Sequence, residues 1–212
     1  HMATEGTFPP YEYYDSGQLV GIDIEVAGAI AEKLGMKLET TDIAFDSIIP
    51  GVQAGKYDIG MAGVTVNEER LQQVNFSDSY ATGVQVVIVK EGGKVQSLDD
   101  MADAIIGTQS GTTGFIYASG DFGDDHVKSF TKTTDAVEAL KNGQVDCVLL
   151  DNAPAEALVE ANPDAGLSIL DTAYANEDYA IAINKENTDL QAKINAALAE
   201  LVADGTLQSI ID

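Results

Sequence analysis

Apolar positions along the chain repeat with two alternating periods, those of short strands and of amphipathic helices. Apolar residues from Ile24 to Leu34 recur every three or four positions, which predicts a helix that starts near Asp23 and ends at Gly35. The same criteria predict helices after 46–47, after 111–114 and at 134–140, 153–160 and 189–202, and strands at 57–60, 84–90, 105–107, 145–150, 167–170 and 179–183. This alternation is typical of an α/β fold with mostly parallel sheets.

Two β-prone runs, Val84–Lys90 and Tyr179–Ile183, contain no turn residues and suit crossings between two lobes. We therefore expect residues 3–82 together with 179–212 to form one lobe and residues 83–178 to form the other. Two strands that join two lobes make a hinge, and hinged lobes close on ligands in a cleft. Periodicity alone does not establish this topology.

Charge and composition exclude several classes of protein. The 35 acidic and 11 basic residues give a net charge of −24, which repels nucleic acids and anionic membrane surfaces and is explained most simply by solubility. The single cysteine, Cys147, lies in an apolar run and is expected to be a buried hydrophobic residue. Two histidines and one cysteine provide no metal-ligand spacing, and no G-x-S-x-G motif is present, so we expect no metal, cofactor or serine nucleophile.

Short motifs follow a fixed order along nearly the whole chain. They are Gly6–Tyr13, Leu19–Glu25, Phe45–Pro50, Gln53–Asp58, Ala62–Arg70, Val74–Ser77, Gly107–Gly114, Val145–Asp151 and Ala203–Thr206. The ordered set resembles the polar amino-acid-binding proteins of bacterial ABC importers, which are extracellular solute-binding proteins of the type II periplasmic-binding fold. The resemblance implies two α/β lobes, each a mostly parallel sheet flanked by helices, with a two-strand hinge. It also implies capture of a free amino acid for a membrane permease, in the periplasm or on a cell-surface lipoprotein.

A free α-amino acid carries a carboxylate and an ammonium on one carbon, and its capture needs a partner for each. The guanidinium of Arg70 can bind two carboxylate oxygens at once, although an exposed Arg70 could instead pair with Glu68 or Glu69. Asp151 ends a predicted strand, where open α/β sheets bind ligands, but it or Asn152 could instead cap the following helix. The resemblance assigns Arg70 to the ligand carboxylate and Asp151 to the ammonium.

Small and hydroxylated residues complete the predicted clamp. Gly63 and Thr65, with the adjacent Ala62, are expected near the ligand ammonium. Thr112 and Thr113 lie in a glycine-flanked turn that enters a helix, where free N–H groups favour an anion. The alternative for this turn is a plain helix start, and a phosphate loop is excluded because the GxxxxGK[ST] pattern is absent.

Four further residues are expected to surround the ligand side chain. Phe8 and Phe45 resemble the aromatic walls of this family, although each alone is more often a core residue. Glu5 and Gln109 occupy positions that in relatives tend to contact the ligand side chain. A carboxylate at Glu5 favours a polar or cationic amino acid, and the sequence leaves the choice among these open.

The start of the chain departs from the family pattern. His1-Met2 resembles a cloning remnant and is excluded from the fold prediction, so only Ala3-Thr4 precede the first motif. We expect an incomplete sheet edge in the first lobe. The protein is expected to be a monomer, with dimerisation or strand exchange if this strand is missing.

Two other functions share this fold. A ligand-sensing domain of a signalling receptor would carry a transmembrane helix and signalling domains in its full-length sequence. A cyclohexadienyl dehydratase-like enzyme would use a cleft carboxylate as a general acid, and Glu5 is the obvious candidate. Because the residues of an amino-acid clamp are all present, we expect a binding protein without catalytic activity.

Overall fold

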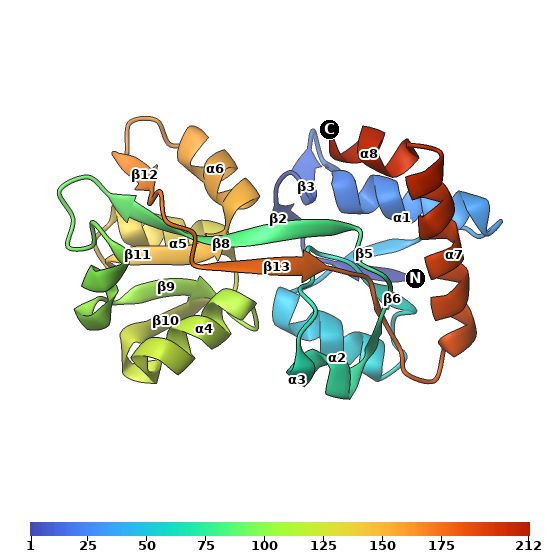
Figure 1. The fold of residues 1–212 in the computed structure, drawn as a ribbon. Coiled ribbons are helices and arrows are strands. Elements are labelled where there is room, and N and C mark those ends of the chain that lie inside the picture. The colour runs from blue at the N-terminus through green and yellow to red at the C-terminus, as the bar shows by residue number, and fades with distance from the viewer. The chain divides into compact units, whose positions relative to one another are not determined.

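The computed structural model describes residues 1–212, which form two compact units (Figure 1). The first lobe comprises His1–Thr82 and Asp178–Asp212, and the second lobe comprises Gly83–Glu177. The chain therefore passes from one lobe to the other twice, after Thr82 and after Glu177.

The first lobe is built on a five-stranded sheet of order β5-β1-β6-β14-β7. The strands of this lobe are β1 (Met2–Thr4), β2 (Thr7–Phe8), β3 (Glu12–Asp15), β4 (Gln18–Val20), β5 (Thr40–Asp42), β6 (Ile59–Gly60), β7 (Asn75–Phe76) and β14 (Ala182–Ile183). Its helices are α1 (Ile22–Lys33), α2 (Ile48–Gln53), α3 (Glu68–Gln73), α7 (Thr188–Ala203) and α8 (Thr206–Ile211), with a 3-10 turn at η1 (Phe45–Ser47). β5, β1 and β6 are parallel, β14 is antiparallel to both of its neighbours, and β2, β3 and β4 form a separate small antiparallel sheet.

The second lobe is built on a sheet of order β10-β9-β11-β8-β12, with β13 also paired to β8. Its strands are β8 (Ala81–Lys90), β9 (Ile106–Gln109), β10 (Val127–Phe130), β11 (Cys147–Asp151), β12 (Leu167–Ile169) and β13 (Ala175–Tyr179). Its helices are α4 (Thr113–Phe122), α5 (Thr133–Lys141) and α6 (Asn152–Glu160), with 3-10 turns at η2 (Leu98–Asp103) and η3 (Asp124–His126). β10, β9 and β11 are parallel, whereas β8 runs antiparallel to β11 and β12.

The predicted α/β fold is confirmed, and along the path of each sheet four strands run in one direction while the fifth, β14 or β8, is antiparallel to both of its neighbours. The antiparallel strands β8 and β14 belong to the segments in which the chain enters or re-enters a lobe. A strand that arrives by such a route need not follow the right-handed crossover that keeps strands parallel.

The first helix shows how local sequence positions an element. Gly21 precedes α1 with φ 124°, and a Cβ there would lie 2.3 Å from the Tyr11 carbonyl oxygen, so only glycine fits. Acidic residues in the first turn and Lys33 in the last turn suit the helix dipole. Gly35 ends the helix in a left-handed conformation, as predicted.

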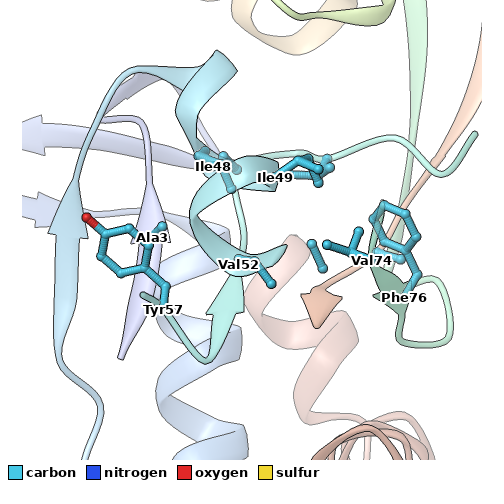
Figure 2. Packing of buried hydrophobic residues seen from close by; sticks show 11 residues of the cluster. Ala3, Ile48, Ile49, Val52, Tyr57, Val74 and Phe76 are labelled. Carbon is cyan, nitrogen blue, oxygen red and sulfur yellow. The ribbon is translucent and has the colours of Figure 1, made fainter. Parts of the chain in front are cut away.

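The core of the first lobe fills the space between α2 and the central sheet. Figure 2 shows Ile48, Ile49 and Val52 of α2 between Ala3 on one side and Phe76 on the other. Ile48 and Val52 are almost fully buried, as the predicted inward face of this short helix requires. Gly60 of β6 provides the room, because a Cβ there would lie 2.5 Å from Ile48 Cγ2.

The prediction of an incomplete sheet edge was wrong. Met2, which was set aside as a remnant, is fully buried in β1, and β1 occupies an inner position between β5 and β6. The His1 carbonyl accepts hydrogen bonds from the N–H groups of Asp58 and Ile59. The three-residue strand β1 therefore completes the sheet between β5 and β6. Dimerisation or strand exchange was expected only if this strand were missing, so that expectation loses its basis.

The predicted strand at residues 179–183 is in fact divided. β13 ends at Tyr179 beside β8, and β14 begins at Ala182 in the other sheet. Residues 179–183 are all fully buried, which explains why they form one apolar run in the sequence. The predicted strand at 57–60 is likewise shorter and comprises only β6, and α8 was not predicted.

Met2→Ala should destabilise the protein by about 2–4 kcal/mol, because it removes a fully buried side chain from the inner strand and leaves a cavity. Met36→Ala is the matched control, since Met36 is half exposed and its loss should cost about 0.5 kcal/mol or less. Urea unfolding of both variants measures the difference. Equal effects would contradict the position of β1 in the core.

Candidate functional site

Arg70 of α3 is the only arginine in the chain, and it is buried, with 5% of its surface exposed. Asn67 caps α3 by accepting a hydrogen bond from the Arg70 N–H at 2.8 Å. The guanidinium donates to the Thr65 carbonyl at 2.6 Å and lies over the Phe45 ring, 5.5 Å from its centroid. Glu68 and Glu69 are exposed, unlike Arg70, so the geometry does not favour a surface ion pair.

The loop that follows β6 contains the predicted residues Ala62, Gly63 and Thr65, all of them buried. Gly63 has φ 52°, and a Cβ there would lie 2.8 Å from the Phe8 ring. Its N–H donates to the carboxylate of Asp23 at 2.8 Å. Only glycine allows Phe8 to pack this closely on a backbone of this conformation.

Glu5 directly follows β1 and is buried, with 3% of its surface exposed. Both carboxylate oxygens accept hydrogen bonds from the Thr7 hydroxyl, at 2.7 and 2.8 Å. Because β1 and β6 are parallel neighbours, Glu5 and the Gly63 loop leave the sheet at the same edge. The predicted first-lobe residues therefore gather at the carboxyl ends of parallel strands, where α/β sheets commonly bind ligands.

In the second lobe, the amide of Gln109 is held by the loop between β10 and α5. It donates to the Thr131 carbonyl at 3.0 Å and accepts from the Thr133 hydroxyl at 3.1 Å. Thr112 is the N-cap of α4, because its hydroxyl accepts from the Phe115 N–H at 3.2 Å and donates to the Gln109 carbonyl. The helix start proposed as the alternative for this turn is thus present, with the buried Thr113 in its first turn.

Asp151 ends β11 and is buried, with 8% of its surface exposed. It occupies the N-cap position of α6, but its side chain makes no capping hydrogen bond. Asn152 does not replace it, because its side-chain oxygen accepts from the Val84 N–H at 3.2 Å. The capping alternative for both residues was therefore wrong, and the Asp151 carboxylate is not used to start this helix.

β9 and β11 are parallel neighbours, so Gln109 and Asp151 emerge at the same edge of the second sheet. The structure thus places the predicted residues in two groups, one at the strand ends of each lobe. No set of three or more histidine, cysteine or acidic side chains is arranged to hold a metal ion, and none of the helices has the length and apolar character needed to cross a bilayer.

Sequence reasoning missed several residues that support these groups. Asn67 orients α3, and the pattern of Asn followed by Glu-Glu could have identified it as an N-cap. In the second lobe, Gln85 is the β8 partner of Asp151 and donates to the buried carboxylate of Glu177 at 2.9 Å. Gln85 and Glu177 lie far apart in sequence, and no local signal pairs them.

The whole chain, residues 1–212, matches the family described as bacterial extracellular solute-binding proteins, family 3. The chain belongs to this family. It is 32% identical to the ABC transporter arginine-binding protein 1 of Escherichia coli (strain K12), over 100% of this chain and 88% of that protein. Two solved structures of an ancestral arginine-binding protein, one bound to arginine and one bound to glutamine, are each 43% identical in sequence to this chain. Each match covers 99% of this chain and 94% of the other, with TM-scores of 0.93 for the arginine complex and 0.94 for the glutamine complex.

Gly63→Ala should destabilise this family 3 protein by about 1–3 kcal/mol, because the new methyl group meets the Phe8 ring and the left-handed backbone disfavours alanine. Gly28→Ala in α1 is the matched control, since a Cβ there meets open space and should stabilise the helix by up to about 1 kcal/mol. Thermal unfolding of the ligand-free variants tests both. A neutral Gly63→Ala would contradict the close packing of Phe8 on this loop.

Proposed function

We propose that the protein binds a free cationic amino acid, with arginine as the first candidate, by closing its two lobes on it. Outside the cytoplasm, the protein then delivers the bound amino acid to the membrane permease of an ABC importer. The observation that carries this proposal is the pair of buried, oppositely charged groups of the two lobes: Arg70 of α3, held by the loop that follows β6, and Asp151 at the end of β11. Relatives named as arginine-binding proteins support it.

In the proposed complex, Arg70 binds the α-carboxylate of the ligand. Its hydrogen bond to Thr65 and its contact with Phe45 hold the guanidinium in one orientation, so little side-chain entropy is lost on binding. Asp151 accepts the α-ammonium, together with groups of the Gly63 loop. Because these partners belong to different lobes, the ligand completes its charge pairing only when the lobes close.

Glu5 is the proposed partner of the ligand side chain. Its carboxylate is buried, is oriented by Thr7, and lies at the same sheet edge as the Gly63 loop. A guanidinium would satisfy it with two parallel hydrogen bonds. Glutamine is the second candidate, because a similar ancestral protein binds it and its amide can donate to the same carboxylate.

We propose no catalytic activity for these residues. The similar proteins reported above are named as binding proteins, and Glu5, the candidate general acid of a dehydratase, has a role as a ligand partner. A receptor that transports an amino acid has no need for a proton donor at the ligand side chain. A periplasmic or a surface-anchored location is equally compatible with this role.

Arg70→Ala should lower the affinity for every amino acid that binds by roughly a hundredfold or more, because a buried charge pair loses one partner at a cost of about 3–5 kcal/mol. The measurement is isothermal titration of protein that has been unfolded, dialysed and refolded to remove ligand, with arginine, lysine, histidine, glutamine and glutamate. Lys37→Ala, which removes an exposed cation, should leave the affinity unchanged. Retained binding by Arg70→Ala would exclude this residue as the carboxylate partner.

Glu5→Gln should change the choice of ligand rather than abolish binding. Arginine affinity is expected to fall by about 10–100-fold, as a charged hydrogen bond is worth about 1.5–3 kcal/mol, while glutamine affinity falls much less. Glu25→Gln, an exposed residue of α1, controls for the loss of one negative charge. An equal loss for arginine and glutamine would place Glu5 away from the ligand side chain.

A further inference from the structure

Two carboxyl groups in the first lobe lie close to each other where no water reaches them. Glu12 of β3 and Asp23 of α1 are both completely buried, and the neighbouring Glu12 side chain is one of the groups that act on the pKa of Asp23. Two ionised carboxylates have no proton to donate and would repel each other at this distance. The pair must therefore hold at least one proton.

The remaining contacts of Asp23 indicate where that proton lies. Its two oxygens accept hydrogen bonds from the Gly63 N–H at 2.8 Å and from the Tyr80 hydroxyl at 2.7 Å. Burial and the neighbouring carboxylates raise the pKa of Tyr80 well above its usual value, so Tyr80 is a neutral donor. Asp23 thus acts as an acceptor toward both of these groups.

This carboxyl pair connects three segments that the proposed ligand site uses. Gly63 belongs to the ligand loop, and Glu12 is the strand partner of Phe8, which packs on Gly63. The backbone N–H of Tyr80 donates to the carbonyl of Tyr179 at 3.0 Å, so Tyr80 is held beside the second chain crossing and lies two residues before the first. A change in the charge of Asp23 would reach all three segments through direct hydrogen bonds or strand pairing.

We propose, building on the function proposed above, that Asp23 and Glu12 are positioning residues for the ligand and that the singly protonated pair is the binding-competent form. A second proton, placed on Asp23, would turn one acceptor oxygen into a donor and leave the Gly63 N–H or the Tyr80 hydroxyl without its partner. It would also remove the negative charge that lies beside the loop expected to face the ligand ammonium. Ligand and proton should therefore compete.

The charged and titratable groups around the pair allow this competition in the mildly acidic range. Burial raises the pKa of Asp23 to about 6, against the lowering effect of hydrogen bonds from Glu12, Gly63 and Tyr80. The other titratable group nearby is Tyr11, which acts on Tyr80 and packs edge-on against Tyr179. Neutral tyrosines do not titrate near pH 6.

As pH rises and Asp23 loses its proton, ligand affinity should increase, whereas the contribution of Asp23 to folding stability should decrease. A ligand that prefers ionised Asp23 lowers the pKa of Asp23, so binding releases a proton and affinity rises with pH through about 6. The pKa of Asp23 in the folded, ligand-free protein is higher than the value of about 3.9 in an unfolded chain. Its contribution to folding stability is therefore complete below that lower value and is lost as pH rises toward 6.

The test is titration calorimetry with arginine from about pH 5 to about pH 7.5, in buffers of different ionisation enthalpy so that released protons are counted. We expect affinity to fall by up to about tenfold at the acidic end, which corresponds to a one-unit change in pKa on binding. Proton release should be largest near pH 6. A flat affinity profile without proton release would overturn the proposal.

Two isosteric variants separate positioning from general stability. Asp23→Asn cannot titrate, so it should bind arginine more weakly at neutral pH and show no change of affinity between pH 5 and 7.5. Glu12→Gln keeps Asp23 titratable, so it should retain the pH dependence and the proton release even where its affinity at neutral pH falls. Glu25→Gln is the matched control and should behave as wild type.

A pH dependence that persists in Asp23→Asn would overturn the assignment. If this variant does not fold, proton release by the wild type and by Glu12→Gln decides, because both keep Asp23. Arginine binding that is tight at every pH and releases no proton would reject this inference but not the proposed function. Absence of binding for any amino acid at neutral pH would reject both.

Discussion

The hydrogen bond between the Gly63 N–H and the buried carboxylate of Asp23 is the interaction on which the first lobe's candidate site depends. It fixes a loop whose left-handed residue has the Phe8 ring packed against it and whose following residues lead to the carbonyl that holds Arg70. An ionised carboxylate without water is costly unless donors surround it. Here a backbone N–H and a tyrosine hydroxyl provide such donors, so the loop and α1 are ordered together.

In the second lobe, neutral groups hold the polar side chains at the edge of the sheet in place. The Gln109 amide is held from both sides by the loop before α5, and the hydroxyl of Thr112 closes the first turn of α4. Asp151 stands beside these residues at the carboxyl edge of the parallel strands without being used as a helix cap. The polar side chains at this edge are thus oriented by hydrogen bonds within the protein, and such orientation lowers the entropy cost of binding.

Hydrophobic periodicity predicted the long elements because each has one buried face. α1, α5 and α7 begin and end within one or two residues of their predicted limits, and Gly35 and Gly205 end α1 and α7 as glycines in the left-handed conformation do. Periodicity fails where burial is complete or the element is very short. The apolar run at 179–183 is buried throughout, so nothing in it marks the division between β13 and β14.

The candidate site was predicted less completely than the fold, for a different reason. Motif order selected Arg70, Glu5 and the Gly63 loop, because these residue types recur where an amino acid must be bound. The motifs Gly6–Tyr13 and Leu19–Glu25 contain Glu12 and Asp23 but gave these two residues no role, since a hairpin and the start of α1 bring their carboxyls together only in three dimensions. A buried acid also looks like any other acid in a sequence with 35 of them.

The acidic surface and the buried acids act at different stages of the proposed binding reaction. A net charge of −24 attracts a cationic amino acid and repels glutamate, but its field is screened within about 8 Å at physiological salt. It can therefore favour encounter with cations without deciding which one is retained. Retention depends on groups removed from water, where screening is weak and geometry decides. In the proposed complex, Glu5, held by Thr7, makes that choice, and Arg70, the only arginine in an acidic chain, provides the local positive charge for the ligand carboxylate.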